Sequence, residues 1–150
     1  MLRIQNFYLD ATLREFHLLR STLEQNPKGL LYISRPKLNE LGSYKLHGVN
    51  CICSDLQIID KLLSPTYVIV RDHPLLDSTV CNIDFSVNKK IKISRSKGTS
   101  RLAKDLALCD TAVGAPTPAL GIARDAGLNV YTLDNSQFSS RAANFPVLSL

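Results

Sequence analysis

A polar turn containing two prolines follows the short apolar run at residues 111–114. Thr117 stands where a helix N-cap is expected, and Pro118 occupies the first helical position, where its missing N–H costs little. The free backbone N–H groups that begin at Ala119, the helix dipole and the Thr117 hydroxyl would together form a phosphate-sized anion site. A threonine at this position also caps its own helix. Capping alone and anion binding therefore both remain open.

A second polar turn, Arg71–Pro74, follows the apolar run at residues 66–71. The His73 imidazole can donate to a phosphate oxygen or protonate a leaving group, which makes it the candidate catalytic residue. Arg71 adds a positive charge for the same phosphate, and Pro74 would hold the turn rigid. A histidine in a turn is also often an ordinary surface residue. If the two turns lie at one edge of a sheet, each supports the other as a binding site.

Helix and strand patterns alternate in the first half of the chain. Thr12 and Glu15 have capping-box spacing, and the apolar residues from Leu13 to Leu23 recur on one helical face. This pattern predicts an amphipathic helix at residues 12–24. Dense β-branched and aliphatic runs predict strands, and a helical period lies between them. The elements predicted next are a strand at 29–34, a helix at 54–63 and a strand at 66–71.

The second half continues the alternation after a loop at residues 72–88. Ser100 can cap a helix bearing Leu102, Leu106 and Cys109, and Gly127 can end the helix that begins near Thr117. The predicted strands are a short one at 91–94, at or near an edge of the sheet, and two more at 111–114 and 129–133. The tail after residue 134 shows no clear period.

Strands that alternate with helices through short loops imply right-handed crossovers and a parallel sheet. We therefore expect an α/β fold: one Rossmann-like parallel sheet with helices on both faces. Its expected parts are an N-terminal amphipathic helix at 1–27 and the Rossmann-like domain itself at 28–150. Ligands of such sheets bind beyond the carboxyl ends of the strands, where both polar turns fall.

Composition narrows the function classes. The chain has 150 residues and a net charge of +5, with basic residues gathered between Lys89 and Lys104. Such a surface favours anionic partners, although an ordinary solvated face is equally consistent with it. That stretch has no aromatic residue for base stacking, so no nucleic-acid partner is expected.

The cysteines and the apolar runs indicate the cellular compartment of the protein. The spacings of Cys51, Cys53, Cys81 and Cys109 fit neither a zinc ribbon nor a redox pair, which favours buried reduced thiols. No apolar run approaches the roughly 20 residues that span a bilayer, and residues 1–10 lack a signal-peptide core. We expect a cytoplasmic protein, with peripheral contact at the inner membrane left open.

The order of these motifs resembles the C-terminal, donor-binding half of bacterial GT-B glycosyltransferases. The resemblance covers residues 28–134 and rests on the Arg-x-His-Pro turn, the helix at 102–110 and the Thr-Pro-Ala-Leu sequence at 117–120. It is strongest with the sialyltransferase and capsular-polysaccharide transferase branch, which has a His-Pro motif and a Ser/Thr motif. The resemblance implies that His73 and Thr117 contact the phosphate of a nucleotide-sugar donor.

Two departures from that family shape the expected function. Many members hold the donor ribose with a Glu, whereas the matching position here is Ile122, so a CMP-linked donor such as CMP-sialic acid suits the motif better. The acceptor-binding domain that supplies a general base has no room in these 150 residues. We expect a domain that needs an acceptor-binding partner or an oligomer, with no cofactor and no metal. Asp105 and Asp110, placed in or at the end of a helix, are expected to be structural.

Two rival functions remain open at this stage. A truncated, non-catalytic domain could keep the fold and act as an interaction or regulatory module, with the helix at 12–24 docking on its partner. Another enzyme built on a single doubly wound sheet is the second rival. The sequence contains no Gly-rich phosphate loop, no G-x-S-x-G elbow and no acidic cluster for magnesium, which speaks against it. The sugar, the acceptor and the linkage are not encoded in any motif.

Overall fold

The computed structural model describes residues 2–33, 37–38, 44–45, 49–71, 91–96, 101–114, 117–133 and 145–148. Its helices are α1 (Leu2–Ser21), α2 (Val49–Leu63), α3 (Leu102–Ala107) and α4 (Pro118–Asp125). Its strands are β1 (Gly29–Ile33), β2 (Lys37–Leu38), β3 (Tyr44–Lys45), β4 (Tyr67–Arg71), β5 (Lys92–Ser96), β6 (Cys109–Gly114), β7 (Asn129–Leu133) and β8 (Val147–Leu148).

Six of these strands form one sheet in which every neighbouring pair is parallel. The spatial order is β5-β4-β1-β6-β7-β8, while β2 and β3 form a separate antiparallel pair. Counted along the chain, the six strands stand in the order 3-2-1-4-5-6, which is the Rossmann order. The predicted parallel sheet is confirmed, and so is the edge position of the short strand after residue 91.

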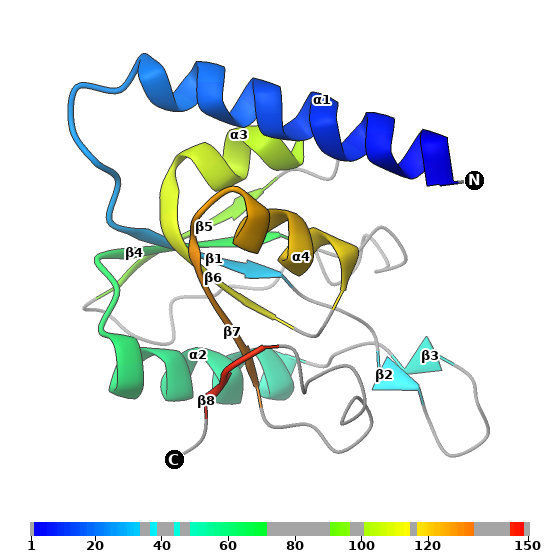
Figure 1. The fold of residues 1–150 in the computed structure, drawn as a ribbon. Helices are drawn as coiled ribbons and strands as arrows, with labels where there is room; N and C mark the ends of the chain where they lie inside the picture. The colour runs from blue at the N-terminus through cyan, green and yellow to red at the C-terminus, as the bar shows by residue number, and fades with distance from the viewer. Residues whose placement is uncertain are drawn as a thin grey trace.

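Helices cover both faces of the sheet, as predicted (Figure 1). Side chains alternate along each strand, so Leu31 joins a core beneath α1, α3 and α4, whereas Leu30 and Tyr32 join a core above α2. All five residues of β1 are buried, because this central strand is covered on both sides. The expected α/β fold class is therefore correct.

The first helix is longer than predicted and belongs to this core. It begins at Leu2 rather than near Thr12, and its Phe16 is only 2% exposed among side chains of α3 and α4. Arg20 donates to the carbonyl oxygens of Ala107 and Cys109 at 3.0 and 3.1 Å, which ties the end of the helix to the turn before β6. Of the apolar face that was expected to dock on a partner, Leu13, Phe16 and Leu19 pack within this chain, whereas Leu23 is exposed.

Other differences arise at element boundaries. Cys109 and Asp110 lie in β6, not in or at the end of the preceding helix, which ends at Ala107. The N-cap position of α3 belongs to Arg101, without a side-chain cap; Ser100 lies outside the described residues. The pairs β2–β3 and β7–β8 were not predicted, since strands of two residues carry too little pattern to be detected.

None of the helices in the described part of the chain is both long and apolar enough to cross a bilayer.

Candidate functional site

The central strands of the sheet end opposite one another at its carboxyl edge. The register pairs Ile33 at the end of β1 with Arg71 of β4 on one side and with Gly114 of β6 on the other. The chain leaves β1 toward β4 but leaves β6 toward β7, so the strand order reverses between β1 and β6. In doubly wound folds this reversal marks the place where ligands bind.

Gly114 allows the two strand ends at this reversal to approach closely. A Cβ atom added there would lie 2.7 Å from the Ile33 carbonyl oxygen and 3.0 Å from the Ile33 Cβ. Backbone atoms cannot give way as a flexible side chain can, so any larger residue would push β1 and β6 apart.

Helix α4 begins directly beyond this edge. Thr117 has extended backbone angles (φ −134°, ψ 164°), and its hydroxyl accepts from the Leu120 N–H at 3.3 Å. The Thr117 carbonyl accepts from the Gly121 N–H at 3.1 Å, and Pro118 has no N–H to satisfy. The predicted N-cap is thus confirmed. The N–H groups of a helix's first turn have no acceptor within the helix, and that of Ala119 is one of them.

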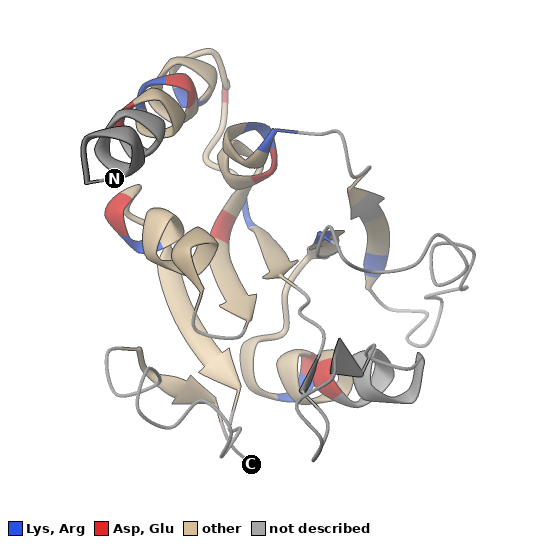
Figure 2. Cartoon of the chain, turned by 90° about the vertical axis from the view of Figure 1, so that its right-hand side faces the viewer, with Lys and Arg blue, Asp and Glu red and all other residues tan. Residues whose placement is uncertain are grey.

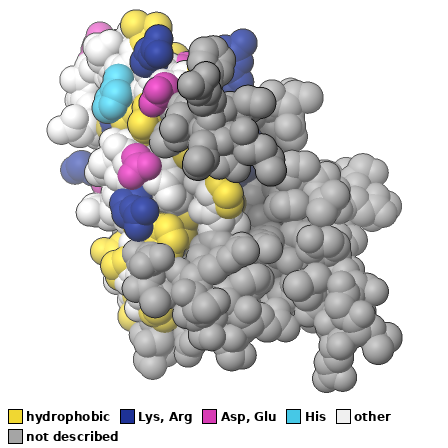
Figure 3. Space-filling model, turned by 45° about the vertical axis from the view of Figure 1, so that its right-hand side comes forward, with side chains coloured by type: hydrophobic (Ala, Val, Ile, Leu, Met, Phe, Trp, Pro, Cys, Tyr) yellow, Lys and Arg dark blue, Asp and Glu magenta, His cyan; other side chains and the backbone are white. Residues whose placement is uncertain are grey.

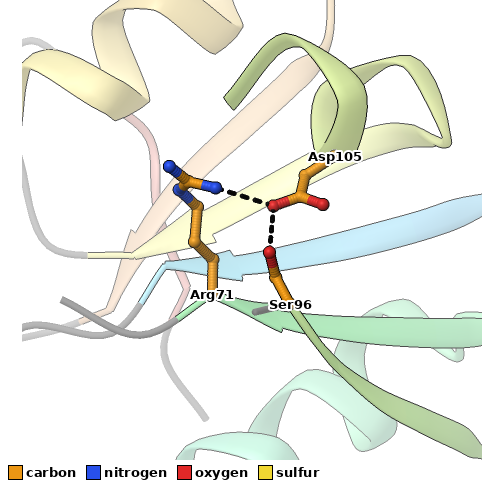
Figure 4. A network of polar contacts seen from close by, with 3 residues as sticks. All are labelled: Arg71, Ser96 and Asp105. Carbon is orange, nitrogen blue, oxygen red and sulfur yellow. Dashed lines mark hydrogen bonds and ion pairs between the residues drawn. The ribbon is translucent and has the colours of Figure 1, made fainter. Parts of the chain in front are cut away.

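Arg71 is held by a polar network at the same edge (Figure 4). Its Nη1 lies 2.9 Å from Asp105 Oδ2, and the Ser96 hydroxyl donates to the same oxygen at 2.6 Å. The Asp105 side chain is 8% exposed and that of Arg71 is 23% exposed. The network joins the last residues of β4 and β5 to α3. The expectation that Asp105 is structural agrees with these contacts.

Arg71 and α4 lie on the same face of the sheet. Ile69, two residues before Arg71, packs in the core beneath α3 and α4, and the alternation along β4 sends Arg71 to that side. Two inter-strand spacings, about 10 Å, separate the end of β4 from the end of β6. His73 follows Arg71 by two residues but lies outside the described residues. The structure thus brings Arg71, Thr117 and Ala119 to one edge and one face.

Of the basic residues between Lys89 and Lys104, three have side chains whose exposure the structure describes. Lys92, Arg101 and Lys104 are all exposed, and Arg101 is paired with Glu15 of α1 at 3.1 Å. Figure 2 shows acidic and basic segments interspersed along the helices, and Figure 3 shows the same mixture on the described part of one surface. For Arg101, this favours the interpretation of an ordinary charged face.

Cys109 is a free thiol with no exposed surface. Burial, reinforced by the nearby carboxylates of Asp105 and Asp110, raises the pKa of the Cys109 thiol to about 12, against a smaller opposing effect of Arg20. A protonated, inaccessible thiol is neither a nucleophile nor a metal ligand. For this cysteine, the predicted buried reduced thiol is confirmed. The described residues hold no group of three or more potential metal ligands.

Ile122 lies on the buried face of α4, with 7% of its surface exposed. A residue at this position points into the core and not toward the carboxyl edge, so a glutamate here would lose hydration without reaching a ribose.

The contact between Asp105 and Ser96 had not been predicted. Ser96 and Arg71 are paired in the register of β4 and β5 and therefore share a face, so a side chain that reaches one of them also comes near the other. This register depends on the tertiary structure. A long connection joins β4 and β5, and no local sequence pattern specifies how the two strands align.

No protein-family model matches the sequence, and no curated protein sequence matches it. The fold is similar to that of KpsC, a β-Kdo 2,7 transferase of Thermosulfurimonas dismutans, with a TM-score of 0.52 and 13% identity over 96% of this chain. It also matches the wall teichoic acid polymerase TagF, with a TM-score of 0.47 and 12% identity over 82% of this chain and 29% of TagF. The present chain spans 47% of the KpsC chain, about half of its length. The KpsC match agrees with an architecture like half of a GT-B enzyme.

Proposed function

We propose that this chain is the donor-nucleotide-binding domain of a glycosyltransferase of surface polysaccharide or lipooligosaccharide synthesis. The observation that carries the proposal is the arrangement at the carboxyl edge: the N-terminus of α4 and the Arg71 guanidinium lie on one face beside the strand-order reversal. Both are suited to an anion. The similarity in fold to a Kdo transferase supports the same class of reaction.

In the proposed reaction, an acceptor hydroxyl attacks the anomeric carbon of the donor sugar as the bond to the phosphate oxygen breaks. Negative charge then grows on the departing phosphate. The Ala119 N–H and the α4 dipole face that charge, and Arg71 stands on the same side. His73, two residues beyond Arg71, would donate to a phosphate oxygen. The acceptor and its general base would come from a separate domain or chain.

A CMP-linked donor is the proposed substrate. Such a donor carries a single phosphate between nucleoside and sugar, and one helix N-terminus provides one phosphate-sized site. Sialic acid is a sugar of this donor class, and the proposal includes it without depending on it.

The test is calorimetric titration of the purified protein with CMP, CDP, UDP and GDP. We expect saturable binding of CMP that is lost in His73→Ala and weakened in Thr117→Val, at unchanged stoichiometry. Thr22→Val is the matched control, because the Thr22 hydroxyl donates locally, to the Leu19 carbonyl at the exposed end of α1. If all three variants bound the nucleotide with the affinity of the wild type, the proposed site would be wrong even though the protein binds a nucleotide.

A non-catalytic interaction module is the second candidate. One observation favours it: both the Thr117 hydroxyl and the Arg71 guanidinium already have partners inside this chain. If no nucleotide binds in the titration while the protein remains folded, the scaffold function replaces the transferase function.

A further inference from the structure

A hollow of about 380 Å³ lies at the amino-terminal edge of the sheet, opposite the proposed nucleotide site. Its walls come from the segment before β1, the turn between α2 and β4, and the first residues of β6 and β7 (Figure 1). This volume is within the range of small-molecule sites. The polar groups that line it include Lys28, Ser64, Thr66, Asp110, Thr111 and Tyr131.

An irregularity of the sheet places a carboxylate in this hollow. Gly29 of β1 pairs with Cys109 whereas Leu30 pairs with Thr111, so Asp110 is an extra residue in β6. A bulge of this kind is rare between parallel strands, and it redirects the side chain of the inserted residue. Asp110 is half-buried, and its Oδ1 accepts from the Thr111 hydroxyl at 2.9 Å. The carboxylate is thereby oriented before any ligand arrives.

The opposite wall is formed by the end of α2. Ser64 adopts a left-handed backbone (φ 45°), which is uncommon for a residue other than glycine, and its N–H closes the helix on the Asp60 carbonyl at 3.1 Å. This sharp stop allows Pro65 and Thr66 to turn along the rim of the hollow before β4 begins.

The chemistry of the lining selects among ligand classes. The charges of Lys28 and Asp110 cancel, which disfavours a strongly charged ligand. The hydroxyls can donate and accept, and the carboxylate accepts only. The apolar part is provided by Leu63 and Pro65, which are both half-buried. A ligand that matches has many hydroxyl groups, no net charge and one apolar C–H surface.

We propose that this hollow binds an uncharged mono- or disaccharide unit, with Asp110 accepting from neighbouring sugar hydroxyls and the half-buried Leu63 and Pro65 covering the C–H face. Hydrogen bonds to an ionised carboxylate are stronger than those between neutral groups, so Asp110 contributes most to affinity. The site is at the far edge of the sheet from Thr117 and goes beyond the proposed function. It can exist whether or not the carboxyl edge binds a nucleotide.

The experiment follows backbone amide shifts of the ¹⁵N-labelled full-length protein during titration with maltose, lactose, cellobiose and di-N-acetylchitobiose. We expect saturable shifts at Ser64, Thr66, Thr111 and Asn129 with at least one of them. In Asp110→Asn, which keeps the shape and the bond from Thr111, the dissociation constant should rise about tenfold. Asp125→Asn, an exposed carboxylate outside the hollow, is the matched control and should leave it unchanged.

Thr66→Val provides a second variant at an exposed rim position, and it should weaken the same titration without altering the melting temperature. Longer oligosaccharides built from the same repeating unit as the bound disaccharide distinguish a free sugar from a polymer. If affinity rises with oligosaccharide length, the natural ligand is a chain that continues past the open rim. The proposal is overturned if no sugar gives saturable shifts, if the shifts map to another surface, or if Asp110→Asn binds as the wild type does. Loss of nucleotide binding would leave these outcomes unaffected.

Discussion

Asp105 shows how a buried charge is tolerated in this fold. It is 6% exposed overall, yet it receives both the Arg71 guanidinium and the Ser96 hydroxyl. Removing one partner of such a pair leaves the other charge poorly solvated, which costs more than the pair itself contributes. The network therefore also sets where Arg71 points at the carboxyl edge.

Replacing Asp105 with Ala is expected to lower the free energy of unfolding by about 2–3 kcal/mol, because the Arg71 guanidinium and the Ser96 hydroxyl both lose this carboxylate at a mostly buried position. Urea unfolding followed by circular dichroism measures this. Asp105→Asn, which retains an acceptor for Ser96, should cost less. A wild-type midpoint for the Ala variant would mean that the network contributes nothing to stability.

Cys109 predicts a stability that depends on pH in the alkaline range. Its folded-state pKa of about 12 lies above the ordinary value of 9.0, so the unfolded chain releases the thiol proton first. The contribution is complete below pH 9 and falls as pH rises from 9 toward 12, by about 1 kcal/mol per pH unit. Burial also raises the pKa of Tyr67 above 10.0, which adds to the loss at higher pH.

Chemical unfolding at intervals between pH 8 and pH 10.5 tests this in the wild type and in Cys109→Ala. The difference between the two stabilities should shrink as pH rises, because only the wild type carries the buried thiol. The burial that raises the pKa of Tyr67 is common to both proteins, and Cys109 raises that pKa further only in the wild type, which acts in the same direction. A difference that is constant with pH would show that the thiol ionises alike in the folded and unfolded states.

At the scale of elements, local sequence signals define both ends of helix α4. Thr117 and Pro118 define its first turn, and Gly127, with φ +96°, ends it in a conformation that other residues rarely adopt. Because β7 follows immediately at Asn129, the helix has a fixed length and its N-terminus is held at the carboxyl edge of the sheet.

Thr117→Val should lower the free energy of unfolding by about 1 kcal/mol, since the Leu120 N–H loses its side-chain acceptor. Thr117→Ser should restore most of that loss, because a serine hydroxyl caps equally well. Thermal unfolding of the three proteins measures this. If Val destabilises but leaves nucleotide affinity intact, Thr117 is a cap and no more.

At the scale of the molecule, α1 is part of the core that holds the site. Phe16 is buried among side chains of α3 and α4, and the Arg20 guanidinium lies 5.1 Å from its ring while bonding to the Cys109 carbonyl. The helix therefore braces α3, the element that carries Asp105.

Phe16→Ala is expected to cost about 3–5 kcal/mol, as for other large buried aromatic residues, and to do so in one cooperative transition. Unfolding followed in parallel by circular dichroism and by proteolysis measures this. If α1 unfolded first and left the sheet intact, the N-terminal helix would be a separate unit. Leu18→Ala, at an exposed position of the same helix, is the control.

The sequence by itself determined the elements whose signals are local. The strands at β1, β4 and β7 were predicted to within one residue at each end, because dense β-branched and aliphatic runs specify buried parallel strands. Helix α4, with Thr117 as its cap and Gly127 as its end, was predicted for the same reason: cap, proline and glycine lie within a dozen residues.

Only the tertiary structure decided which of these elements meet. The capping-box pattern placed the start of the first helix near Thr12, whereas α1 continues back to Leu2. Cys109 satisfies a helical period, yet pairing with Gly29 of β1 draws it into a strand. The Arg71–Asp105 pair spans 34 residues and the bulge at Asp110 exists only against β1. Such contacts depend on sheet register and helix packing, which are free energies of the whole fold rather than of any segment.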